Sequence, residues 1–150
     1  MSYTGSKAGI GLGTILSIVS SGSPITDTVV GELNKCSFTG RQAGTADVTN
    51  FQSAAKEFIP TLIDSGTIEI SGNRIGSDAG QLAMETAFTS LQLHAFTIQL
   101  PKSQSQINAG DSCSFTALIE QLNYDVSVDK IVTLEGRLKV SGILTWTAGS

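Results

Sequence analysis

The stretch TADVTNFQSAAKEFIPTLIDSGTIEISGN, residues 45–73, is the most distinctive run in this chain of 150 residues. Residues 54–59 contain good helix formers, but the ring of Pro60 disfavours the helical conformation at the preceding residue, so no more than about two turns of helix can form. The pair Ser65-Gly66 marks a turn, and residues 67–71 alternate polar and apolar side chains as a half-buried strand does. The stretch predicts a loop that docks by its aromatic and aliphatic side chains and then leads into a strand.

The remainder of the chain predicts one mainly β domain, a β-sandwich or barrel-like structure with one α-helix. Runs rich in β-branched and aromatic residues, separated by Gly, Ser, Asn and Pro, are typical of strands and turns. Strands are expected at residues 14–19, 28–38, 67–71, 93–100, 112–122 and 130–146. The last strand would span about 50 Å at roughly 3.3 Å per residue. It therefore either bends at Gly136 and Gly142 or extends beyond the core of one subunit.

One helix is expected over residues 82–91. Within it, four apolar residues recur at the spacing of a single helix face, namely Met84, Ala87, Phe88 and Leu91. Ser77 or Asp78 can cap the helix by accepting a hydrogen bond from a free backbone amide. This pattern predicts a helix that packs over a sheet or a barrel mouth.

The N-terminal residues 1–13 differ in composition from the rest of the chain. They are rich in Gly and Ser, and Tyr3 and Ile10 are the only residues that could anchor them. We expect a flexible arm at residues 1–13 and the β domain at residues 14–150, with the arm becoming ordered against a neighbouring subunit in an assembly.

The composition is low in charge and slightly acidic. The chain is 40% hydrophobic and only 15% charged, with a net charge of −4. This balance argues against tight binding of nucleic acid, because such proteins concentrate Lys and Arg on one face. Cys36 and Cys113 match no metal-binding spacing. One disulfide between them is possible but not required, and free, buried thiols are expected. The apolar region at residues 10–19 is too short and too polar to cross a bilayer.

No catalytic, cofactor-binding or metal-binding residues are expected. The single histidine, His94, lies in a predicted strand with Phe96 and Ile98 on the same face, which favours a packed or interface residue. Four carboxylates fall at solvent-facing strand positions, namely Glu32, Glu69, Glu120 and Glu135. If these strands line one wall, the wall would be acidic, with Arg137 and Lys139 diluting the charge. The alternative interpretation is that they are ordinary exposed strand residues.

The central stretch also carries a family resemblance. The order Asp47-Val48-Thr49, then Glu57-Phe58-Ile59-Pro60, then Leu62-Ile63-Asp64, Gly66 and an alternating strand resembles the major tail tube proteins of long-tailed bacteriophages. The resemblance continues through the helix, a strand ending at Pro101, and a long strand with a Ser141-Gly142 step, from about Thr28 to Trp146. Thr61 departs from the pattern, because relatives often carry glycine there. The motif around Phe58 favours noncontractile tails.

This resemblance implies a structural virion protein of the phage tail. Strands of neighbouring subunits would pair into a continuous tube lumen, and rings of six subunits would stack into the conduit for genome ejection. Implied partners are further copies of the chain, the tape measure protein, and the tail-tip and tail-terminator proteins, with DNA passing transiently and without specificity. The protein would be made in the host cytoplasm and would end in the virion tail. Candidate interface residues are Tyr3, Ile10, Phe51, Phe58 and Leu62.

Two other functions fit the same sequence. One is a tube-forming secretion component of the Hcp type, which would share the ring geometry but carry effectors. The other is a monomeric β-sandwich module that binds a ligand. Rings or tubes in electron micrographs would favour the tube functions, and a stable monomer at high concentration would favour the module.

Overall fold

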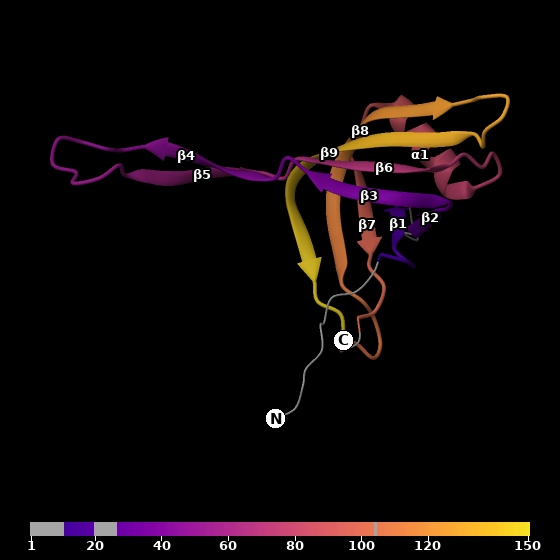
Figure 1. Ribbon diagram of the computed structural model, residues 1–150, viewed down its shortest axis with the longest axis horizontal. Coiled ribbons are helices and arrows are strands. Elements are labelled where there is room, and N and C mark those ends of the chain that lie inside the picture. Colours follow the sequence, from indigo (N-terminus) through magenta and orange to yellow (C-terminus); the bar gives the residue numbers. More distant parts are fainter. Residues whose placement is uncertain (1–10, 20–26, 104) are drawn as a thin grey trace.

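The computed structural model of the protein describes residues 11–19, 27–103 and 105–150. Within them, seven strands form one antiparallel sheet, two more form a separate hairpin, and there is one helix (Figure 1). The elements are β1 (Ile15–Val19), β2 (Asp27–Val30), β3 (Leu33–Thr39), β4 (Gln42–Asp47), β5 (Phe58–Asp64), β6 (Thr67–Asn73), α1 (Ala79–Ser90), β7 (His94–Gln99), β8 (Ser112–Asp125) and β9 (Thr133–Thr147). The large sheet has the order β2-β1-β7-β8-β9-β6-β3. The prediction of a mainly β domain with one helix is confirmed.

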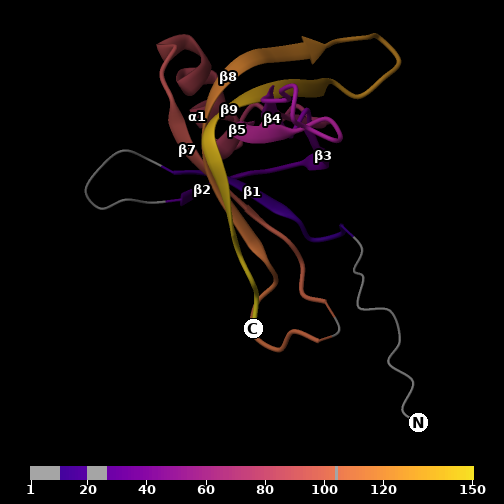
Figure 2. The ribbon, with the colours of Figure 1, turned by 90° about the vertical axis from the view of Figure 1, so that its left-hand side faces the viewer.

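The large sheet bends because β8 and β9 are long enough to belong to two layers. Residues 112–117 of β8 pair with β7, whereas residues 133–139 of β9 pair with β6. The two long strands pair with each other throughout, with register shifts that mark bulges in their ladder, and Gly142 has a φ of 86°. Bulges and glycine allow strands to turn from one layer into the next. Figure 2 shows β8 and β9 rising together and then bending over.

The bend defines two layers. The first layer consists of β3, β6, residues 133–139 of β9 and residues 118–125 of β8. The second layer consists of β2, β1, β7, residues 112–117 of β8 and residues 140–147 of β9. The hydrophobic core contains side chains from both layers and from α1, including Ile68, Met84, Phe96, Ile119 and Leu138. Phe96 and Phe115 stack within it, with ring centroids 5.6 Å apart.

The helix begins earlier than the sequence pattern predicts. Asp78 is its N-cap, as expected, and its carboxylate accepts a hydrogen bond from the Gln81 amide at 2.9 Å. Met84 and Ala87 are buried, as the predicted stripe requires. Leu91 is 75% exposed, so its assignment to the stripe is wrong. It adopts the left-handed conformation at the C-cap, which turns the chain away from the core.

The predicted strand at residues 28–38 is wrong as a single element. It is two strands, β2 and β3, which lie at opposite edges of the large sheet. The chain changes direction at Gly31 and Glu32, where Glu32 has a φ of 60°. The Gly31 amide donates a hydrogen bond to the Asp78 side chain at 3.1 Å, so the cap of α1 also fixes this turn.

The loop predicted before residues 67–71 is instead a hairpin. Residues 42–47 and 58–64 are the paired strands β4 and β5, and no turn of α-helix forms at residues 54–59. The hairpin projects away from the body of the molecule (Figure 1). Every residue of β5 is exposed. Pro60 is tolerated here because β5 is an edge strand, where a missing N–H donor costs little.

The other expected strands form with small shifts of their ends. β8 continues past Leu122 to Asp125, and β9 begins at Thr133 instead of Lys130. Cys36 and Cys113 are free, as expected. Cys113 is fully buried, whereas Cys36 is only partly buried. Burial disfavours the thiolate and raises the pKa of Cys36 to about 11.

The root of the hairpin is held tightly against the body. The buried Ser65 donates a hydrogen bond from its hydroxyl to the Gly142 carbonyl, and the Val140 amide donates to the Gly66 carbonyl at 3.1 Å. Gly66 has a φ of 75°, and a Cβ at this position would lie 2.1 Å from the Thr39 carbonyl oxygen. Glycine is therefore required where the hairpin leaves the sheet.

We predict that Gly66→Ala lowers the free energy of unfolding by about 2–3 kcal/mol, because it combines a left-handed backbone with a backbone clash. Urea denaturation followed by circular dichroism measures the change. Gly76→Ala is the matched control, since nothing lies within 4 Å of a Cβ there. Equal stability of Gly66→Ala and the wild type would contradict this account of the hairpin root.

Candidate functional site

The described residues offer no metal-binding cluster. They contain no group of three or more His, Cys, Asp or Glu side chains placed to hold a metal ion. His94 lies at the start of β7, where its Nε2 is 3.1 Å from the Ser90 hydroxyl at the end of α1. None of the described helices has the length and apolar character needed to span a membrane. The features that distinguish this molecule are surfaces.

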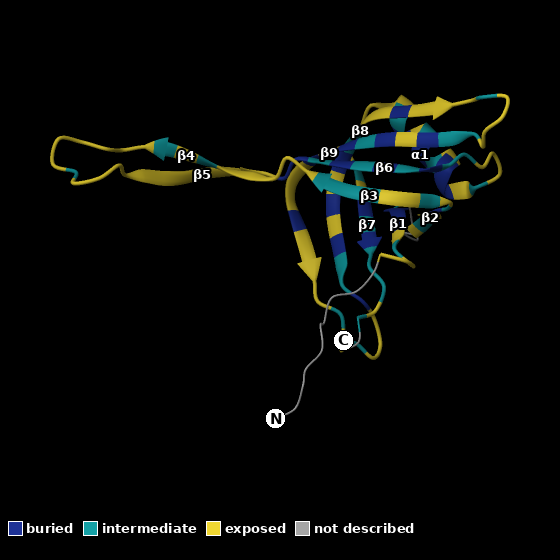
Figure 3. Ribbon diagram, viewed as in Figure 1, coloured by how far each residue is buried: buried dark blue, intermediate teal, exposed yellow. Residues whose placement is uncertain are grey.

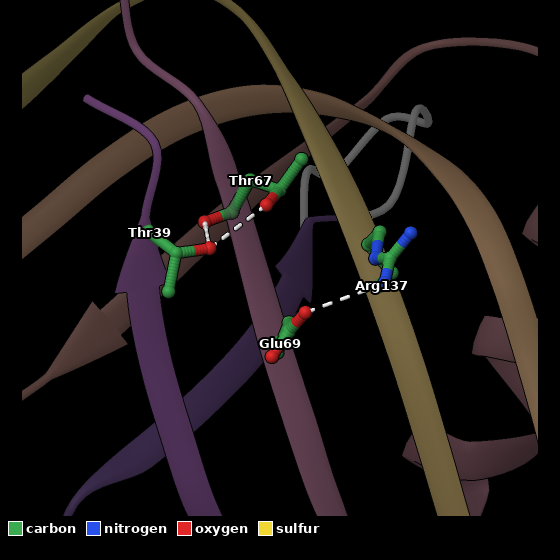
Figure 4. A network of polar contacts seen from close by, with 4 residues as sticks. All are labelled: Thr39, Thr67, Glu69 and Arg137. Carbon is green, nitrogen blue, oxygen red and sulfur yellow. Dashed lines mark hydrogen bonds and ion pairs between the residues drawn. The ribbon is translucent and has the colours of Figure 1, made fainter. Parts of the chain in front are cut away.

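The outer side of the first layer is a polar surface, which we call the charged face. It consists of the alternate residues whose neighbours along each strand point into the core: Lys35, Ser37 and Thr39 of β3; Thr67, Glu69 and Ser71 of β6; Glu135, Arg137 and Lys139 of β9; and Gln121 and Asn123 of β8. Side chains on neighbouring strands of this face contact one another (Figure 4). Glu69 and Arg137 form an ion pair at 3.4 Å, and the hydroxyls of Thr39 and Thr67 lie 3.0 Å apart.

The structure brings the four predicted lumen carboxylates to this side of the sheet. Glu69 and Glu135 belong to the charged face directly. Glu120 lies at the register shift of β8, between buried Ile119 and Leu122. Glu32 precedes β3, and its carboxylate accepts a hydrogen bond from the Asn73 side chain at 3.3 Å.

The charged face is mixed in sign. Its anions, Glu69 and Glu135, alternate with Arg137, Lys139 and a third cation, Lys35, that the sequence interpretation did not include. An open hollow of about 210 Å³ on this face is lined by Lys35, Glu69, Glu135 and Arg137 among others. Because opposite charges alternate, their fields largely cancel beyond a Debye length of about 8 Å at physiological salt. A surface of this kind has no large patch of a single charge sign.

The first layer has two open sides. β3 pairs with β6 on one side, and no backbone hydrogen bond joins its other side to a described strand. Residues 118–125 of β8 likewise pair only with β9 among the described strands. An unpaired edge is a template for strand addition. The sequence did not reveal these edges, because an edge is defined by which strands become neighbours.

The projecting hairpin is apolar on both faces. Phe58 and Ile59 are consecutive strand residues and so point to opposite faces, yet they are 67% and 52% exposed. Phe51, at the tip, and Leu62 are exposed too, so all three predicted hairpin anchors are exposed. In Figure 3, β5 and most of the hairpin have the colour of exposed residues. Sequence reasoning missed Ile59 and Ile63, although a strand with apolar residues on both faces is the signal for two-sided burial.

The hairpin is ordered by its own polar contacts. The Thr49 amide donates to the Asp47 carboxylate at 2.9 Å, and the Thr49 hydroxyl accepts from the Glu57 amide at 2.8 Å. Hydrogen bonds from Thr49 hold the pKa of Asp47 below its usual value. The Ser53 hydroxyl donates to the Glu57 carboxylate at 2.7 Å. The hairpin therefore presents its apolar side chains from a defined backbone.

A second group of exposed apolar residues lies at the opposite end of the molecule. The turn between β8 and β9 carries Val126, Val128 and Ile131, which are 74%, 108% and 70% exposed. In Figure 1 this turn lies at the right and the hairpin at the left of the long axis. Patches at opposite ends suit head-to-tail association of identical subunits. The predicted contacts Tyr3 and Ile10 lie outside the described residues.

Known structures share this fold. The tail of an empty gene transfer agent particle, refined with C6 symmetry, matches with a TM-score of 0.71 and 18% identity over 94% of this chain and 100% of that chain. The SPP1 tail tube matches with a TM-score of 0.69 and 17% identity over 93% of this chain and 78% of that chain. A chain of the anti-feeding prophage baseplate matches with a TM-score of 0.69 and 9% identity, covering 95% and 97%.

A comparison with curated proteins found no match. The sequence model of the family described as phage tail tube protein matches residues 11–146, which is most of the chain. The chain belongs to the phage tail tube protein family.

Proposed function

We propose that copies of this chain join side by side into rings of six and that the rings stack head to tail into the hollow tube of a phage tail. The chain is a structural tail tube subunit by family. The observation that carries the proposal is the first layer, a strip of four strands with two open edges and one polar face. Closing such strips edge to edge pairs both open edges of the layer and gives a barrel with a polar interior.

The number six rests on comparison. C6 symmetry is given for the gene transfer agent tail, whose subunit has the same fold. In a ring of this kind the charged face lines the lumen, with Glu69 and Glu135 among the residues that face the interior. Its alternating charges suit a conduit, because a strongly basic wall would retain DNA phosphates. Glu32 and Glu120 lie at the two margins of the same wall.

Stacking uses the two apolar ends of the molecule. The hairpin of one subunit reaches the next ring, where both of its faces become buried, and the turn carrying Val126 and Val128 lies at the end that receives it. Contacts of this kind close around the ring and stay open along the axis, so the polymer grows as a tube.

The further partners follow from the proposed tube. The tape measure protein would occupy the lumen during assembly in the host cytoplasm, growth would start on the tail-tip complex, and a terminator would end it. Matching folds occur in structures of an injection-system sheath and tube terminator and of a tube-terminating cap. The same fold thus occurs in contractile injection systems, and the Glu57-Phe58-Ile59-Pro60 motif is what favours a noncontractile tail here.

The direct test is self-assembly of the purified chain. We expect sedimentation and negative-stain electron microscopy at high protein concentration, with preformed tube fragments added as seeds, to show rings or tubes with a central channel. The reason is that the open edges and the exposed hairpin bury their groups only against other copies. A seeded, concentrated solution that contains only monomers would refute the proposal and favour a monomeric module.

Leu62→Ser should separate assembly from folding. Leu62 is 86% exposed in the subunit, so we expect the free energy of unfolding to change by no more than about 0.5 kcal/mol while tube formation falls sharply. Leu138, in the core, is the control, because Leu138→Ala should lower the free energy of unfolding by about 2–5 kcal/mol. Chemical denaturation of the monomer and sedimentation of the polymer give the two readouts. Tubes that form as readily with Leu62→Ser would argue against the hairpin contact.

The N-terminal arm is a second proposed contact, through Tyr3 and Ile10. Deleting residues 1–11 should block polymerisation and leave a folded monomer, since the β domain begins after them. Circular dichroism checks the fold, and electron microscopy checks the polymer. Unchanged tube formation by the shortened chain would count against a role of the arm.

A further inference from the structure

Two strand edges of the first layer are complementary in direction. The four strands β3, β6, β9 and β8 alternate in direction, because each neighbouring pair is antiparallel. An even number of alternating strands has its two outer strands pointing in opposite directions. When copies are related by rotation about a ring axis, β3 of one therefore lies antiparallel to β8 of the next. Continuous antiparallel pairing around the ring needs no change in either strand.

The second layer is less suited to this role. Its outer strand β2 has only four residues. Its other outer strand, residues 140–147 of β9, is partly covered by the hairpin root, where Gly142 accepts a hydrogen bond from Ser65. Trp146 on the same segment packs against Phe38, with ring centroids 5.8 Å apart. The open and extended edges belong to the first layer.

The two first-layer edges also differ in charge. Within β3 the single charged residue is Lys35, which is exposed on the charged face. Glu32 lies just before the strand, where its carboxylate accepts a hydrogen bond from the Asn73 side chain. Residues 118–125 of β8 carry two, Glu120 and Asp125, which are both exposed, and no cation. Lys35 lies in a row with Ser71, Glu135 and Asn123 across the layer. Asn123 thus lies between the two acidic positions of β8, and either carboxylate is within reach of a lysine after the stagger that a closed barrel requires.

We propose, on the basis of the proposed tube, that β3 of one subunit pairs with residues 118–125 of β8 of its ring neighbour. Attraction between Lys35 and the acidic pair Glu120 and Asp125 selects this contact. Opposite charges across neighbouring strands stabilise pairing, and like charges oppose it. Backbone hydrogen bonds would close the sheet, while the charges exclude pairing of β3 with β3 or of β8 with β8. These side chains lie in solvent at the rim of the lumen, so salt weakens the attraction between them.

The test uses two charge-reversed variants that complement each other. Lys35→Glu makes both edges acidic, and the double variant Glu120→Lys with Asp125→Lys makes both edges basic. Each alone should lower the sedimented, tubular fraction by about tenfold at low salt, and the loss should shrink at high salt. An equimolar mixture should restore tubes, because a six-membered ring can alternate the two variants and place opposite charges at every contact. Distinct fluorescent labels should then appear in the same tube.

Matched controls separate this contact from general charge effects and from misfolding. Lys139→Glu makes the same charge change on the charged face, but on the inner strand β9, and should leave tube formation unchanged. Circular dichroism of each monomer should match the wild type.

The possible outcomes separate the two proposals. If the wild type forms tubes, any of three results would overturn the proposed pairing and leave the tube intact. The charge-reversed variants could assemble normally, their mixture could assemble no better than each variant alone, or Lys139→Glu could cause an equal loss of tubes. The edge charges would then serve only to keep the free subunit soluble. Wild-type protein that never forms tubes would overturn the tube itself.

Discussion

The pairing of β8 with β9 is the interaction on which the rest of the structure depends. These two strands run through both layers, so their ladder connects the sheet that carries the charged face to the sheet that carries β1, β2 and β7. Their inward residues, among them Cys113, Ile119, Leu134 and Leu138, supply much of the core. Because the ladder bends at bulges and at Gly142, one pair of strands can enclose that core from two sides.

The subunit is incomplete in two different ways. At the edges of the first layer, side chains are solvated, but the backbone donors and acceptors have no strand partner among the residues that the structure describes. In the hairpin, the backbone ladder is complete but apolar side chains such as Phe58 and Leu62 stay in water. Hydrogen bonding between backbones favours pairing of the open strand edges with another subunit, and burial of apolar side chains favours docking of the hairpin. In the proposed tube, the first kind closes a ring and the second joins rings, so the two contacts draw on separate physical forces.

The hairpin root shows how a projecting element can still be directed. Gly66, the hydrogen bond from the Ser65 hydroxyl to Gly142, and the contact of Thr39 with Thr67 fix the point where the ribbon leaves the sheet. A defined root and an internally bonded tip reduce the conformational entropy that binding would otherwise cost. The position of the exposed apolar side chains is thereby coupled to the body of the subunit.

The sequence by itself determined the local elements. Alternation located β6, β7, β8 and β9, the spacing of Met84 and Ala87 located the buried side of α1, and Asp78 marked the helix start. Local patterns could not determine the hairpin, because the helix formers at residues 54–56 and the apolar residues at 58–63 bury nothing within one subunit. They also could not separate β2 from β3, since the break depends on a hydrogen bond between Gly31 and Asp78, far apart in the chain.

Tertiary structure alone decided which surfaces are incomplete. Lys35, Glu120 and Asp125 are ordinary polar strand residues in the sequence, and they acquire meaning only when the order β8-β9-β6-β3 places them at the two margins of one layer. The physical reason is that side-chain periodicity is a local property of a strand, whereas an edge is the absence of a neighbour, and neighbours are chosen by the packing of the whole chain.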